Sequence, residues 1–178
     1  MKRSYGIGLM ASVVFAFVAG SAEGQTTANG PYYATPSWDQ TLPAATRFIV
    51  LTNLGSAAVL DRETGLVWER SPSTTTGATW FGQSFHCIDL NTGGRTGWRL
   101  PTIQELLSLV DRSQSNPALP SGHPFNVQSS NYWASTTPGN ADSAWVVAFS
   151  SGSVGAGDKS SSGGLAWCVR GGQGVDPQ

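Results

Sequence analysis

The chain changes from an extended strand to a helix within residues 97–106, GWRLPTIQEL. Trp98 and Leu100 alternate as residues on one side of a strand do, so we expect both side chains to point into a core. Arg99 lies between them and points the other way, toward a carboxylate or a carbonyl oxygen. Pro101 ends the strand, because its backbone has no N–H to donate. These residues therefore predict packing roles for this motif in preference to ligand binding.

A capping box starts a helix at the end of this stretch. The Thr102 side chain accepts a hydrogen bond from the Glu105 amide, and the Glu105 carboxylate reaches back to the Thr102 amide. Apolar residues then recur at i, i+3, i+4 and i+7, which places them on one helix face. They are Ile103, Leu106, Leu107 and Val110. The pattern predicts a helix that ends near Asp111.

The other predicted elements are shorter. A first helix is expected over residues 79–90, with Trp80, Phe85 and Ile88 near one face and Cys87 near its end. Short apolar runs bounded by turn residues predict strands. These runs are residues 48–51, 57–60, 66–68, 132–135, 144–149 and 165–169. The fold class expected is α+β, with two helices packed on small antiparallel sheets and long loops between the strands.

Gly, Ser, Thr and Asn make up about half of residues 121–165. Trp133 and Trp145 interrupt this polar stretch, and we expect both in the core. The stretch is thus interpreted as long loops laid over a small sheet, where binding residues are often found. Its polar side chains are the candidate ligand-binding surface. They are Asn131, Tyr132, Ser135, Asp142, Ser143, Ser150, Ser153 and Lys159.

The N-terminus has the layout of a secretory signal peptide. Lys2 and Arg3 precede the apolar run 7–19, and small residues end at Ala22. An uncleaved membrane anchor is the alternative, but an apolar run of about 13 residues is shorter than the ~20 needed to span a bilayer. The protein is therefore expected to be exported, periplasmic or extracellular, with no membrane span after cleavage. The expected parts are a signal peptide (1–22), an N-terminal arm or linker (23–46), one domain (47–172) and a C-terminal tail (173–178).

The chain has two cysteines, Cys87 and Cys168. In an oxidising compartment an even pair favours a disulfide. It would close a loop of about 80 residues and stabilise the fold by about 4 to 5 kcal/mol in the chain-entropy model. The alternative is a reactive thiol pair, but the two residues form no CxxC motif.

Only 12% of residues are charged, against ~25% in a typical soluble domain. Without Lys2 and Arg3, eight of the ten basic residues remain against eleven acidic ones, a formal charge of −3. Nucleic-acid binding needs clustered Lys and Arg, so this class of partner is excluded. Seven Trp and seven Phe argue against a disordered chain, because they need a core to bury them.

Catalytic motifs are absent from the sequence. HExxH, GxSxG and a Walker lysine do not occur, and His86 and His123 have no metal-ligand spacing. Two carboxylate pairs, Glu105 with Asp111 and Glu69 with Asp61, could form a glycosidase-type dyad, but any secreted domain offers such pairs. We therefore expect no enzyme, no catalytic residue and no cofactor.

Calcium is the one metal for which the loops offer ligands. Asn126, Asn131, Asp142 and Asp158 carry the oxygen atoms that Ca²⁺ prefers. No DxDxDG loop is present, so solvated loop residues are the preferred interpretation and no metal ligand is assigned.

Six short motifs follow one another in a recognisable order. They are Thr64–Trp68; Thr79-Trp80 followed by Cys87; Gly97–Thr102 followed by Glu105-Leu106; Tyr132–Thr136; Ala144–Val147 followed by Phe149 and Gly152; and Cys168–Gly171. In this order, from about residue 58 to 172, the chain resembles the DUF1566 family, also called the Lcl C-terminal domain family.

The resemblance implies a C-type-lectin-like fold related to the formylglycine-generating-enzyme group. In that fold a disulfide typically ties the first helix to the last strand, which suits Cys87 and Cys168. Arg170, in the last motif, is expected to have a packing role like that of Arg99.

The function expected is a secreted, non-enzymatic binding or adhesion module, with an extracellular glycan or protein as ligand. Three alternatives remain. A target protein diversified by a retroelement would have the same fold and a variable loop face. A formylglycine-generating-type secreted enzyme would need two free thiols. A structural envelope protein would have no discrete ligand.

Overall fold

The computed structural model describes residues 27–28, 41–74 and 78–171. The expected signal peptide, most of the expected arm and the expected C-terminal tail lie outside the described residues. Within the described part of the chain, no helix has the length and apolarity to cross a bilayer.

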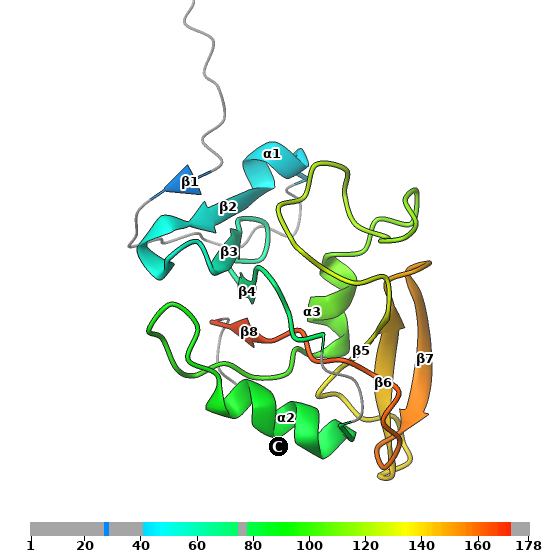
Figure 1. Ribbon diagram of the computed structural model, residues 1–178. Helices are drawn as coiled ribbons and strands as arrows, with labels where there is room; N and C mark the ends of the chain where they lie inside the picture. Colours follow the sequence, from blue (N-terminus) through cyan, green and yellow to red (C-terminus); the bar gives the residue numbers. More distant parts are fainter. Residues whose placement is uncertain (1–26, 29–40, 75–77, 172–178) are drawn as a thin grey trace, which may run out of the picture.

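The first sheet combines the N-terminal half of the domain with its last strand (Figure 1). Its spatial order is β1 (Thr27–Ala28), β2 (Phe48–Leu51), β3 (Ala58–Asp61), β4 (Val67–Glu69) and β8 (Val169–Arg170). β1 is parallel to β2, and the other neighbours are antiparallel. β2, β3 and β4 follow the apolar runs expected as strands. β1 and the short helix α1 (Ala44–Arg47) fall where no regular structure was expected.

The second sheet has three antiparallel strands in the order β5 (Asn131–Trp133), β6 (Ser143–Ala148) and β7 (Ser153–Asp158). β7 was expected to be a loop, and that expectation is wrong. Its sequence, SVGAGD, has low β-propensity. Pairing with β6 along all six residues of both strands stabilises it instead.

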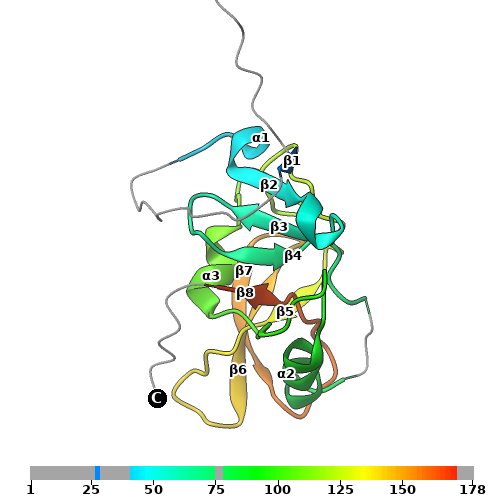
Figure 2. The same ribbon diagram turned by 90° about the vertical axis from the view of Figure 1, so that its left-hand side faces the viewer.

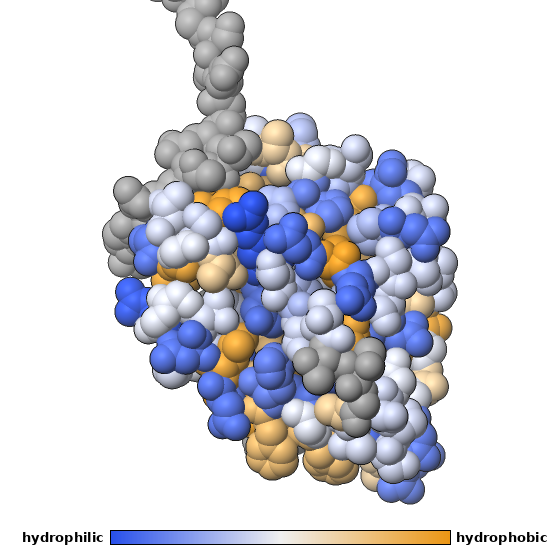
Figure 3. All heavy atoms as spheres, viewed as in Figure 1, coloured by the Kyte–Doolittle hydropathy of each residue, from blue (hydrophilic) through white to orange (hydrophobic). Residues whose placement is uncertain are grey.

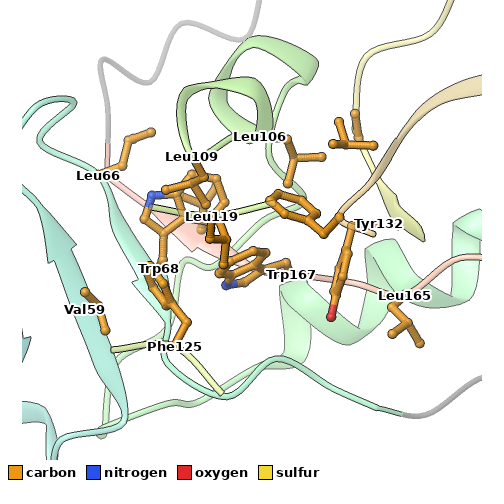
Figure 4. Packing of buried hydrophobic residues seen from close by; sticks show 14 of the residues in the cluster. Val59, Leu66, Trp68, Leu106, Leu109, Leu119, Phe125, Tyr132, Leu165 and Trp167 are labelled. Carbon is orange, nitrogen blue, oxygen red and sulfur yellow. The ribbon is translucent and has the colours of Figure 1, made fainter. Parts of the chain in front are cut away.

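Two hydrophobic clusters lie on opposite faces of β2, β3 and β4. Because neighbouring strand residues point to opposite faces, Phe48 and Val50 enter the first cluster while Ile49 and Leu51 enter the second. The first cluster contains an aromatic group in which Trp167 contacts four rings at centroid distances of 5.0 to 5.6 Å; they are Trp68, Phe125, Tyr132 and Phe149. Figure 4 shows the first three of them around Trp167. The second contains Trp98, Trp133 and both cysteines.

The segment Leu165–Val169 runs between the two sheets and is buried throughout. Figures 1 and 2 show it leaving the side of β5 and reaching the edge of β4 as β8. Its side chains alternate, with Leu165, Trp167 and Val169 in the first cluster and Ala166 and Cys168 in the second. It was expected as one strand over 165–169, but ladder pairing begins only at Val169.

The disulfide expected between Cys87 and Cys168 is confirmed. It joins this segment to α2 (Trp80–Asp89), which occupies the lower edge of the molecule in Figure 1. Gln83, on the same side of α2, donates a hydrogen bond to the Gly164 carbonyl at 3.1 Å. The buried face of α2 is thus formed by Gln83 and Cys87. The expected apolar face is exposed, with Phe85 at 62% and Ile88 at 57%.

The capping box that opens α3 (Ile103–Ser108) is formed as expected. The helix ends before Asp111, because the Leu109 amide bonds to the carbonyls of both Leu106 and Leu107 and tightens the last turn. The Ser108 hydroxyl also donates to the Glu105 carbonyl at 2.7 Å.

The side chains of the segment that precedes α3 are buried or hydrogen-bonded within the domain. Trp98, Leu100 and Pro101 are buried. The Arg99 guanidinium makes two hydrogen bonds to the Glu105 carboxylate, at 2.8 and 2.7 Å, and Arg170 donates to the Thr96 carbonyl at 2.8 Å.

The observed class is therefore α+β, with small, mainly antiparallel sheets, few helices and one disulfide.

Candidate ligand-binding site

One face of the second sheet carries a cavity of about 300 Å³. The three strands and the following loop line it, each with small or uncharged side chains. The lining residues are Asn131, Trp133, Val146, Ala148, Ser153–Gly157, Ser161, Gly163 and Gly164. The volume is at the lower end of the range for small-molecule sites. It suits a single sugar unit or one side chain of a protein ligand.

Strand alternation explains which residues reach this cavity. In β5, Tyr132 points into the first hydrophobic cluster, so its neighbours Asn131 and Trp133 point to the other face. In β6, Val147 is buried in the same cluster, which turns Val146 and Ala148 toward the cavity.

Trp133 forms a buried wall of the cavity, and two glycines allow the chain to pass close to its ring. A Cβ atom on Gly157 would lie 2.6 Å from Trp133 Cη2, and one on Gly164 would lie 2.5 Å from Trp133 Nε1. Trp133 is 1% exposed, and its indole N–H has no hydrogen-bond partner. Any side chain at either glycine would push against a ring that has little room to move.

The cavity offers hydrogen bonding without charge. Asn131, Ser153 and Ser161 contribute an amide and two hydroxyl groups, and no acidic or basic residue lines it. β7 is an edge strand of its sheet, so backbone donors and acceptors lie beside the cavity as well. These groups suit a neutral ligand recognised by shape and hydrogen bonds.

A second hollow, of about 460 Å³, lies between the start of α2 and the far end of β6 and β7. Asp142, Asp158, Lys159 and Phe81 are among its lining residues. The Lys159 ammonium donates to the Ala141 carbonyl at 2.7 Å and lies 4.7 Å from the centre of the Trp80 ring. Hydrogen bonds from Ser160 lower the pKa of the Asp158 carboxyl.

The eight predicted surface residues thus do not form a single site. Asn131 and Ser153 line the first cavity, and Asp142 and Lys159 line the second hollow. Ser143 and Ser150 are half-buried and line neither. The Ser135 hydroxyl is directed inward and donates to the Pro101 carbonyl at 3.1 Å.

Tyr132 was expected on the binding surface, and this is wrong. It is 1% exposed, in the first hydrophobic cluster. Burial raises the pKa of its hydroxyl to about 12, and the hydroxyl donates to the Gln128 carbonyl at 3.2 Å. The alternation of β5 places Tyr132 in the first cluster and its neighbours Asn131 and Trp133 on the opposite face, which a three-residue strand between polar loops did not reveal.

The four candidate calcium ligands are not brought together. Asn131 lies level with Ser153 across the sheet, whereas Asp158 pairs with Ser143 at the opposite end of β7. Asp142 is beside Asp158 at the second hollow, and the Asn126 amide is directed to the Ser71 hydroxyl instead.

Glu69, His86 and Cys168 form a group that the sequence spacing did not signal. Their potential ligand atoms lie within 4.8 Å of one another, and the Glu69 carboxylate accepts a hydrogen bond from the Cys168 amide at 3.1 Å. The Cys168 sulfur is bonded to Cys87, so it offers no thiolate to a metal ion.

The carboxylates considered for a catalytic dyad are engaged elsewhere. Asp61 is fully buried and bonds to the Arg47 guanidinium at 2.9 and 2.8 Å. Glu105 is held by Arg99 and by the capping box.

We predict that Gly164→Ala destabilises the fold by about 1 to 3 kcal/mol, because the new methyl group overlaps the Trp133 indole. Gly163→Ala is the matched control. Its Cβ would meet no atom within 4 Å, so its effect should stay within about 1 kcal/mol. Urea unfolding of the two variants measures both values. Equal stabilities would show that the close approach of Gly164 to the ring is not a constraint.

We also predict a pH effect from Glu69. Burial raises its pKa from 4.5 to about 7, so the folded state holds this proton at a pH where the unfolded chain has lost it. The contribution of this group to stability is complete below pH 4.5 and is lost as pH rises through 7. Melting temperatures between pH 4.5 and 8 should fall for the natural protein relative to Glu69→Gln, which stays neutral. Parallel curves would contradict this.

No curated protein is similar enough to this chain to count as a match. A comparison with protein families gives a match: residues 57–170 match the Lcl C-terminal domain. The matched region includes the strands from β3 to β8, the helices α2 and α3, and every lining residue of the two hollows. The elements β1, α1 and β2 precede it. The chain therefore belongs to the Lcl C-terminal domain family.

Proposed function

We propose that this protein is an exported, non-enzymatic binding or adhesion module with a C-type-lectin-like fold. Its ligand is a neutral glycan or an uncharged surface of a protein. The observation that carries the proposal is the uncharged cavity on the face of the second sheet, beside the exposed edge strand β7. Export rests on the N-terminal sequence, and the fold relation rests on the family resemblance.

The composition of the cavity favours binding over catalysis. Neither a nucleophile activated by a base nor a pair of carboxylates lines it, and such groups are what hydrolytic chemistry needs. A formylglycine-generating-type enzyme would need two thiols, whereas the two cysteines of this chain are joined to each other. A binding role needs only the shape, amide, hydroxyl and backbone groups that are present.

The rigidity of the site also supports recognition. Trp133 is held between strands and glycines, so the cavity wall is fixed before a ligand arrives. A preformed site loses less conformational entropy on binding than a mobile loop does. The low charge of the chain is consistent with this mode of binding, because neutral contacts supply affinity without electrostatic steering of the ligand.

The test fills the cavity with one side chain. Gly155 lines the cavity and a Cβ there would meet no atom within 4 Å, so Gly155→Phe should fold and occupy the space. Gly139→Phe is the matched control, because Gly139 has equal free space and lies outside the cavity. Both variants and the natural protein are applied to arrays of neutral, sialylated and sulfated glycans and of extracellular proteins, with and without Ca²⁺.

We predict that a neutral glycan or a protein is bound by the natural protein and by Gly139→Phe, and at least about tenfold more weakly by Gly155→Phe. Binding that survives in Gly155→Phe would place the ligand elsewhere. A folded protein that binds nothing on repeated arrays would contradict the binding module and favour the structural envelope protein. A near-identical template repeat beside the gene, differing at adenines, would instead identify the retroelement-diversified form.

A further inference from the structure

Helix α2 presents an apolar stripe to solvent. Phe81, Phe85 and Ile88 lie at positions i, i+4 and i+7, which share one helix face. They are 56%, 62% and 57% exposed, and with Val154 they are the exposed large hydrophobic residues of the described chain. Figure 3 shows hydrophobic atoms gathered at the lower edge of the molecule, where Figure 1 places α2.

The orientation of α2 is fixed, so the stripe cannot turn inward. Cys87 is bonded to Cys168, and Gln83 donates to the Gly164 carbonyl, both on the opposite side of the helix. Burying these two residues leaves the stripe outside. Contiguous apolar side chains on a soluble surface are characteristic of interaction sites.

Carboxylates border the stripe at both ends. Phe81 also lines the second hollow, together with Asp142 and Asp158. Asp89 is exposed next to Ile88 at the end of the helix. Lys159, which lines the same hollow, donates to a backbone carbonyl and covers the Trp80 ring. The carboxylates that border the stripe therefore favour a partner that carries positive charge.

We propose that the stripe Phe81–Phe85–Ile88 and the adjoining acidic hollow form a docking surface for a protein segment that carries apolar side chains next to a lysine or arginine. The stripe is about 10 Å long at the 1.5 Å rise of a helix, which matches a segment of two helical turns or three to four extended residues.

An anionic membrane is disfavoured by the bordering carboxylates. A second copy of the chain would bring the same carboxylates to one interface. The surface uses none of the residues of the uncharged cavity, so it does not depend on the proposed function.

The experiment uses a phage-displayed library of random dodecapeptides, selected on the immobilised full chain and depleted on its Phe85→Ser variant. Enriched peptides are synthesised, and their Kd values are measured at low and high salt. We expect enrichment of apolar residues beside Lys or Arg, and binding at least about tenfold weaker in Phe85→Ser and in Ile88→Ser. Phe85→Leu keeps an apolar side chain and should keep binding. Both substituted positions are exposed, so circular dichroism should show unchanged folding for all three variants.

The charge is tested by a matched pair of aspartates. Asp158 and Asp111 are both unburied, and each accepts hydrogen bonds from the amide and hydroxyl of the serine two residues later. Asp158→Asn should raise Kd several-fold and reduce its dependence on salt. Asp111→Asn, away from α2, should leave Kd unchanged.

Several results would overturn the proposal. These are enriched peptides without basic residues, equal binding to Phe85→Ser, or equal effects of the two aspartate variants. Dimerisation in sedimentation experiments that Phe85→Ser abolishes would assign the surface to a second copy. Binding to vesicles of anionic phospholipid that Phe85→Ser abolishes would assign it to a membrane.

Discussion

The buried segment from Leu165 to Val169 is the constraint on which the rest of the structure depends. Its amide and carbonyl at Leu165 bond to Asn131 and Trp133 of β5 at 2.8 and 3.0 Å, while Val169 pairs with β4. One short stretch thus joins both sheets, and the disulfide adds α2 through Cys168. Its alternating side chains fill two clusters at once, so a shift of one residue would exchange Trp167 with a cysteine bonded to α2. The position of the candidate cavity follows from this register.

Local signals were enough to predict some elements. The capping box of Thr102 and Glu105 and the apolar run of β2 each predict their structure from a few neighbouring residues. The order of the motifs predicted the correct family. Tertiary contacts decided the rest. β7 is a strand because β6 pairs with it. Tyr132 is buried because of the face its strand presents to Trp167, and α2 exposes Phe85 because its other side carries the disulfide. The cavity combines residues 131 to 164, whose arrangement no local pattern encodes.

The few charged residues of the chain are distributed unequally between the two candidate binding surfaces. The cavity on the second sheet is lined by uncharged groups around a fixed tryptophan, which suits recognition by shape and neutral hydrogen bonds. The few carboxylates of this half of the domain gather instead near the apolar stripe of α2. An uncharged cavity and an acidic-bordered stripe give the two surfaces different ligand chemistries on one disulfide-linked scaffold.

If the segment Leu165–Val169 holds the second sheet in place, this sheet opens only together with that segment. Native-state hydrogen exchange at low denaturant tests this directly. We predict that the amides of Trp133, Leu165 and Val169 exchange with one shared opening free energy, equal to that of global unfolding. Exchange of the β5 and β6 amides through a separate opening of lower free energy, with Val169 still protected, would show that the second sheet does not depend on this segment.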